Sequence, residues 1–237
     1  MDDAACCITQ GLEADPMAPG TVRGSHFRKT AHRFPAPHDP VAVLPQLRAG
    51  AVLLEINAFA RPYPSHWRTV QSYIGQVLAA AGQLAAVAEF GLATFEVLTL
   101  ALERTLVEKI LALVRAGYAS DPLVELQAKV RHAYDLHQLL QQPTLRTFLA
   151  SADFSILLAD ARADDARNQE FQGDWATRPL REARLFADEG QLWQQLIPTY
   201  RGIFRQLVHG PLPTPAAVAA TLATVGQRLA TLDEPRE

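Results

Sequence analysis

Residues 103–140 constrain the fold more than any other stretch, because they carry two consecutive apolar patterns with helical spacing. In the first, over 104–116, Leu106, Ile110 and Val114 repeat on one face. The second runs over about 123–140. We therefore expect two long helices that pack on a shared core.

Charged residues interrupt these patterns. Lys109 lies in the middle of the first, and Arg131, His132 and Asp135 fall in one turn of the second. A helical lysine usually extends to solvent, and an Arg–Asp pair four residues apart usually forms a weak surface ion pair. The order and spacing of these residues, with Glu55 upstream, favour a functional site.

Glu55 interrupts the clearest predicted strand, the apolar run 51–59. A carboxylate there is costly to bury without a cation or hydrogen-bond donors. In one interpretation, Glu55 points to a polar face beside Arg61 or Lys109. In the other it is a ligand of Mg²⁺, which prefers hard oxygen ligands.

The segments around this strand suggest a sheet followed by helices. Residues 21–35 alternate loosely, which predicts one or two strands, and 93–100 predicts a strand that leads into the first helix. Residues 62–67 indicate a turn, and 70–84 indicate a helix. We expect an α+β fold: a partial antiparallel or mixed sheet, then a helical C-terminal region. We expect three divisions: a disordered arm over 1–20, a partial α/β region over 21–102 and a helical domain over 103–237.

The C-terminal half is predicted to be helical. The sequence indicates helices over 143–160, 191–207 and 215–232, with Pro198 kinking or splitting the second. The polar segment 164–178 predicts a loop, in which Asp164 and Asp165 face solvent. We expect Trp193 to belong to the core.

Charge and composition exclude several classes of protein. The formal net charge of −3 argues against a polyanion-binding surface over the whole chain. The two cysteines, Cys6 and Cys7, are adjacent and have no metal-binding spacing. We expect no membrane association, because no apolar run reaches about 18 residues. The acidic N-terminus does not resemble a signal peptide, so we expect a cytoplasmic protein.

The motifs together resemble a known family. "ERTLVEKILALVR" followed by "KVRHAYDLHQLL" resembles the AbiEii/AbiGii-type nucleotidyltransferase toxins of bacterial abortive-infection and toxin–antitoxin systems. There, a lysine-containing helix precedes an R-[DH]-x-x-D-L helix. "VLLEINAFARPYP" resembles the strand that carries the family's third carboxylate.

The resemblance implies that the expected sheet is a partial nucleotidyltransferase-like one, and it implies a role for each matching residue. Glu55 would be a magnesium ligand, and Lys109, Arg131 and Arg115 would bind a nucleoside triphosphate. Asp135, together with Lys109, would be catalytic, as a base or by orienting the acceptor. His132 occupies a position where aspartate is common in the family. The implied partners are a nucleotide, a tRNA, other RNA or protein acceptor, and a cognate antitoxin.

One family motif has no match upstream of Glu55. Gly24 and Ser25 are followed by His26 and Phe27 and then by basic residues, not by D-x-D. Three hypotheses follow. The first is a nucleotidyltransferase toxin whose missing motif is encoded before Met1 or supplied by another chain. The second is a non-catalytic remnant that binds nucleotide, RNA or antitoxin, and the third is a helical protein-interaction module.

Overall fold

The computed structural model describes residues 12–18, 21–24, 27–33, 51–57, 61–188 and 190–233. The chain divides into two compact units, Met1–Arg61 and Pro62–Glu237. Small antiparallel sheets and a helical C-terminal region confirm the expected α+β class.

The first unit contains a four-stranded antiparallel sheet. Its strands are β1 (Glu13–Asp15), β2 (Val22–Arg23), β3 (Phe27–Arg33) and β4 (Ala51–Asn57). Strand β3 is central: β4 pairs along its whole length, so β1 and β2 occupy its other edge. The strands predicted in 21–35 and 51–59 are confirmed, whereas β1 lies in the segment expected to be an arm.

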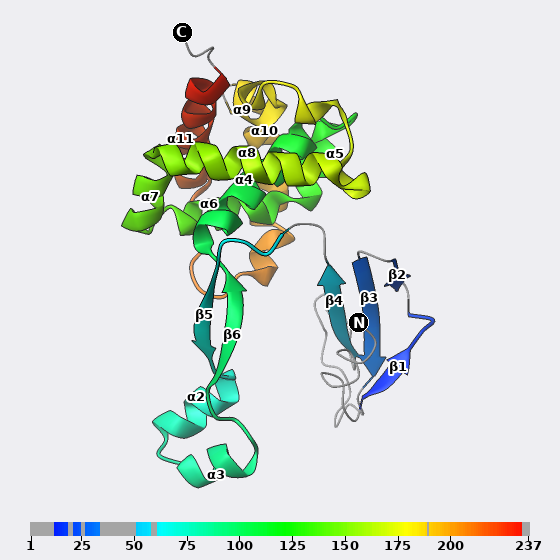
Figure 1. Cartoon of the computed structure of the whole chain (residues 1–237), viewed down its shortest axis with the longest axis vertical. Coiled ribbons are helices and arrows are strands. Elements are labelled where there is room, and N and C mark those ends of the chain that lie inside the picture. Colours follow the sequence, from blue (N-terminus) through cyan, green and yellow to red (C-terminus); the bar gives the residue numbers. More distant parts are fainter. Residues whose placement is uncertain are drawn as a thin grey trace. The chain divides into compact units, whose positions relative to one another are not determined.

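The second unit begins with a two-stranded hairpin. Strands β5 (Ser65–Val70) and β6 (Phe95–Leu100) pair antiparallel, and α2 (Tyr73–Ala80) and α3 (Leu84–Glu89) connect them. The register pairs the last residue of β5 with the first of β6, so α2 and α3 lie at one end of the hairpin (Figure 1). The connection expected over 62–67 ends at Pro64, because β6 pairs with Ser65–Val70 and makes the rest of that segment a strand.

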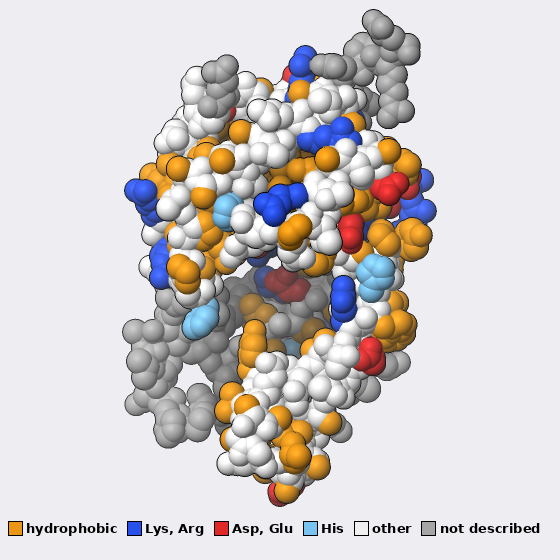
Figure 2. Space-filling model, turned by 90° about the vertical axis from the view of Figure 1, so that its left-hand side faces the viewer, with side chains coloured by type: hydrophobic (Ala, Val, Ile, Leu, Met, Phe, Trp, Pro, Cys, Tyr) orange, Lys and Arg blue, Asp and Glu red, His pale blue; other side chains and the backbone are white. Residues whose placement is uncertain are grey.

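Apolar side chains are exposed at this end of the hairpin. Figure 2 shows them over the lower part of the view, where α2 and α3 lie. The largest are Tyr73, Ile74, Val77, Leu84 and Phe90, each at least 66% exposed. Glu89 is the only charged residue of α2 and α3, so this surface is apolar and almost uncharged.

Helix α4 (Leu102–Gly117) is the centre of the helical region (Figure 1). It packs against helices α5 to α9. The other helices of this region are α5 (Pro122–Ala128), α6 (Val130–Leu139), α7 (Pro143–Ala150), α8 (Ala152–Arg167), α9 (Arg184–Ala187), α10 (Gln191–Arg201) and α11 (Pro215–Asp233), with 3₁₀ turns η1 (Gln169–Phe171), η2 (Asp174–Ala176), η3 (Leu180–Glu182) and η4 (Phe204–Leu207).

Two predicted helices are each divided in two. The helix expected over 123–140 breaks at Lys129, which ends α5 and precedes α6. The helix expected over 143–160 breaks at Ser151, whose hydroxyl accepts a hydrogen bond from the Phe154 amide at 3.3 Å and caps α8. Both breaks leave apolar residues buried on either side, so each half keeps its own packing face.

The core of the second unit confirms that Trp193 is buried and that a helix, α11, covers 215–232, whereas the helix expected over 191–207 ends at Arg201 and is followed by the turn η4. Trp193 is 1% exposed, and its ring meets that of Tyr200 edge to face at 5.4 Å. Burial raises the pKa of Tyr200 to about 12, and its hydroxyl donates to the Pro213 carbonyl. Pro198 is accommodated inside α10, which ends three residues later. Within the described residues, no helix combines the length and apolar character needed to cross a bilayer.

Candidate functional site

Helices α4 and α6 bring two of the predicted site residues together. Lys109 and Asp135 are 26 residues apart, yet Lys109 Nζ donates to Asp135 Oδ2 at 2.6 Å. The two side chains are 22% and 31% exposed. The pair is therefore partly screened from water but remains accessible to a ligand.

The neighbours of Asp135 keep it ionised. Burial by itself favours the neutral acid, but His132 and Lys109 favour the carboxylate more strongly and hold the pKa of Asp135 below its ordinary value. His132 Nδ1 lies 3.9 Å from Asp135 Oδ2, which is longer than a hydrogen bond. Lys109 is thus the closer partner of Asp135, and the two side chains form an ion pair in this structure.

His132 lies beside this pair without a hydrogen bond at its inner nitrogen. Nδ1 is buried and has no partner among the described residues. Burial lowers the pKa of His132, Lys109 and Arg131 lower it further, and Asp135 acts in the opposite direction. The imidazole is therefore neutral near pH 7.

Arg131 is exposed on the same helix. Its expected pairing with Asp135 does not occur, and no ion pair of Arg131 is present in the described part of the chain. The guanidinium is free to meet an anion near the Lys109–Asp135 pair.

A second set of charges lies on a different face of α4. Arg104, Glu108 and Arg115 fall on one stripe, because the intervals of four and seven residues each return to nearly the same angle. This stripe lies about 120° around the helix from Lys109. Arg104 donates to Glu108 at 2.9 Å and to Asp164 at 3.3 Å.

The structure corrects the prediction for Asp164 and Asp165, which were expected to face solvent. They are 7% and 5% exposed, because α8 continues through Arg167 and packs both against α4. Asp164 pairs with Arg104 and with Arg167, and Asp165 pairs with Arg115. This network was not predicted from the sequence, although the stripe of charges on α4 was a signal for it.

Arg115 is engaged by protein groups in this structure. Besides its ion pair with Asp165, its guanidinium lies 4.0 Å from the ring centre of Phe171 and 5.5 Å from that of Trp175. Burial lowers its pKa, and Asp165 opposes that shift. Nucleotide binding by Arg115 stays a prediction, and a nucleotide would have to compete with these contacts.

Glu55 lies in the first unit and pairs with the cross-strand residue Lys29. Its side chain is 49% exposed. Among the described residues, no three His, Cys, Asp or Glu side chains cluster as metal ligands would. A single carboxylate that is already neutralised by an ammonium does not make a magnesium site. The described groups therefore do not fit the implied metal.

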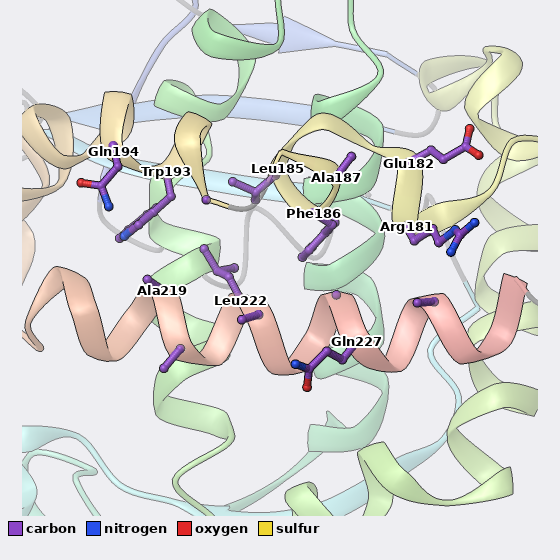
Figure 3. Close-up of a pocket in the computed structure, with 15 residues that line it drawn as sticks. Arg181, Glu182, Leu185, Phe186, Ala187, Trp193, Gln194, Ala219, Leu222 and Gln227 are labelled. Carbon is purple, nitrogen blue, oxygen red and sulfur yellow. The ribbon is translucent and has the colours of Figure 1, made fainter.

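A separate groove of about 800 Å³ lies between α11 and the segment from η3 to α10 (Figure 3). One wall is formed by α11, mostly by its alanines and Gly226 together with Leu222, and the other wall includes Leu185, Phe186 and Trp193. Among the lining residues that the structure describes, only Arg181 and Glu182 are charged. Neither Lys109 nor Asp135 reaches it, so it is distinct from the candidate site.

One comparison with known proteins gives a match. The sequence model described as "Nucleotidyl transferase AbiEii toxin, Type IV TA system" matches residues 8–223. Searches of curated proteins and of solved structures give no significant match. The matched region covers both α4 and α6, and with them the Lys109–Asp135 pair.

Proposed function

Because this chain belongs to the AbiEii nucleotidyl transferase toxin family, we propose that it transfers a nucleotide from a nucleoside triphosphate to an RNA or protein acceptor. Membership of a type IV toxin–antitoxin family also implies a cognate antitoxin. The acceptor class and the nucleotide are part of the proposal.

The Lys109–Asp135 pair is the observation that supports this function best. The ammonium of Lys109 is a compact charge on a flexible stem, which suits binding to a triphosphate. It is held at 2.6 Å by Asp135 in a partly buried position, from which it can exchange a carboxylate for a phosphate. We propose that the exposed Arg131 adds a second positive charge to the same nucleotide.

Asp135 then has a role of its own. Once Lys109 binds phosphate, the carboxylate is free to orient an acceptor hydroxyl or to accept its proton. Magnesium remains a prediction from the resemblance, which implies Glu55 as its ligand, although Glu55 is paired with Lys29 in this structure. Since the described residues do not form a metal site, no step is assigned to the metal.

Nucleotide binding tests the role of Lys109. We expect Lys109→Ala to weaken binding of magnesium–nucleoside triphosphates by roughly 10- to 100-fold, because a charged hydrogen bond contributes about 1.5–3 kcal/mol. Isothermal titration calorimetry of the full chain against each of the four triphosphates would measure this. Lys129→Ala is the matched control, since Lys129 pairs with Glu125 on the surface. Equal affinity for the wild type and Lys109→Ala would remove Lys109 from the site.

Transfer is tested separately from binding. With triphosphates labelled at the α-phosphate, we expect label to enter total RNA or total protein, and Asp135→Asn to abolish this without weakening nucleotide binding. Binding without transfer would favour the second candidate, a non-catalytic nucleotide-binding protein. The absence of an acidic cluster among the described residues supports that candidate. If neither binding nor transfer occurs, a helical interaction module remains.

A further inference from the structure

His132 offers two different nitrogens to its surroundings. Nδ1 is buried, faces Asp135 and has no hydrogen-bond partner among the described residues. Nε2 makes no hydrogen bond with any described residue, yet it is not among the buried atoms that lack a partner. Nε2 is therefore accessible to solvent. One nitrogen thus faces the carboxylate, and the other is accessible to solvent.

We propose that Asp135 and His132 form a dyad in which Asp135 orients the Nδ1–H group and Nε2 takes the proton of an acceptor hydroxyl. This inference rests on the proposed function and adds the identity of the proton acceptor to it. Asp135 becomes a positioning residue, because it acts through the imidazole.

Lys109 controls the dyad through a shared atom. Both Lys109 Nζ and His132 Nδ1 approach the same oxygen, Asp135 Oδ2, at 2.6 Å and 3.9 Å. In the free protein Lys109 occupies that oxygen. When a triphosphate draws the ammonium away, a shift of about 1 Å brings Nδ1 within hydrogen-bond distance of the carboxylate. Nucleotide binding and activation of the base are thereby linked.

The reaction is balanced with the two substrates alone. The acceptor oxygen forms a bond to the α-phosphorus, while the bond from that phosphorus to the oxygen bridging to the β-phosphorus breaks. Pyrophosphate leaves with the electron pair, and the hydroxyl proton moves to Nε2. The resulting imidazolium is stabilised by the carboxylate of Asp135, as a general base requires.

The surrounding charges keep His132 neutral before the reaction. Lys109 faces it from α4, and Arg131 and Asp135 face it from α6 itself. Glu125 of α5 and Lys129, which precedes α6, pair with each other. Within the described residues, no charged group of α10 or α11 contributes to the His132 pKa. A neutral imidazole is the form that can accept a proton.

The tautomer of His132 tests the dyad directly. ¹⁵N NMR of the full-length protein distinguishes a proton on Nδ1 from one on Nε2, and loss of a signal in His132→Gln assigns the resonance among the seven histidines. We expect Lys109→Ala to place the proton on Nδ1. Lys109→Ala combined with Asp135→Asn should remove that preference, and Lys129→Ala should leave the wild-type tautomer unchanged. If His132 in Lys109→Ala keeps its proton on Nε2, the dyad is overturned.

A second arm separates this inference from the proposed function. Adding a saturating magnesium–nucleoside triphosphate to the wild type should produce the same Nδ1–H tautomer. If Lys109→Ala shows the tautomer but no triphosphate binds, the dyad stands and the proposed function fails. If a triphosphate binds and the tautomer does not change, the link between binding and base activation is overturned.

Where transfer is measurable, His132→Gln should lower kcat at least 100-fold with unchanged nucleotide affinity, and an unchanged kcat would contradict the role of His132.

Discussion

At the scale of single residues, the Lys109–Asp135 contact is the central feature. Each side chain is about three-quarters enclosed, so water screens the ion pair less than it does a fully exposed pair. The sequence placed these residues on two helices, and the structure shows that they meet. The neighbouring His132 adds a neutral group whose ionisation responds to both.

The energetic coupling of this pair can be measured by a double-mutant cycle. We expect Lys109→Ala and Asp135→Ala to be non-additive in the free energy of unfolding by about 1 kcal/mol, since the two groups share one contact. Urea unfolding of the wild type, both single variants and the double variant gives this coupling. Strict additivity would show that the contact contributes nothing to stability.

The pH dependence of stability follows from His132. Its pKa is lower in the folded protein than its ordinary value of 6.5, mainly because of burial. Below about pH 6.5, His132 binds a proton in the unfolded chain before it does so in the folded chain. The contribution of the neutral, buried His132 to the free energy of unfolding is therefore complete above about pH 6.5 and declines as the pH falls. Between pH 7.5 and 5.5, His132→Gln should lose less stability than the wild type in urea unfolding. Equal losses would contradict the lowered pKa.

At the scale of elements, two faces of α4 make ion pairs with different helices. One face carries Lys109 toward α6, and the other fixes α4 to α8 through Arg104, Arg115 and two buried aspartates. Because the buried ion pairs restrict rotation of α4 about its axis, they also determine where Lys109 points. Gly117 at the end of α4 allows close packing, since a Cβ there would lie 3.0 Å from that of Ala183.

Removing Arg104 should destabilise the helical unit strongly. The residue is 2% exposed, and Arg104→Ala removes one of the cations that pair with the buried Asp164. We expect a loss of about 3 kcal/mol, whereas Arg131→Ala, on an exposed helix face, should change stability by less than about 0.5 kcal/mol. Thermal and urea unfolding check both. A loss below 1 kcal/mol for Arg104→Ala would show that the buried pair is not a structural constraint.

At the scale of the whole molecule, the two units differ in how they are stabilised. All buried residues of the large apolar cluster lie between Leu106 and Leu229, within the second unit. The described part of the first unit has few buried side chains and depends mainly on backbone pairing around β3. The second unit therefore contains what it needs to fold by itself.

This predicts that residues 62–237, expressed alone, fold cooperatively. We expect a single urea transition with a midpoint within about 0.5 M of the corresponding transition in the full chain, because the core is unchanged. Circular dichroism and tryptophan fluorescence should give coincident curves, since Trp175 and Trp193 are buried in this core. Non-coincident or non-cooperative unfolding would show that the first unit is required.

The sequence alone determined the helical class of the second half, the helices around Lys109 and Asp135, and the burial of Trp193. Each follows from local periodicity, which needs no knowledge of distant contacts. The tertiary structure decided the features that depend on partners far along the chain. Strand β5 exists because β6 pairs with it, and Asp164 and Asp165 are buried because α4 supplies arginines to pair with them. A charged side chain can be buried where the fold places an opposite charge beside it. The local sequence around that side chain does not show whether such a partner will be there.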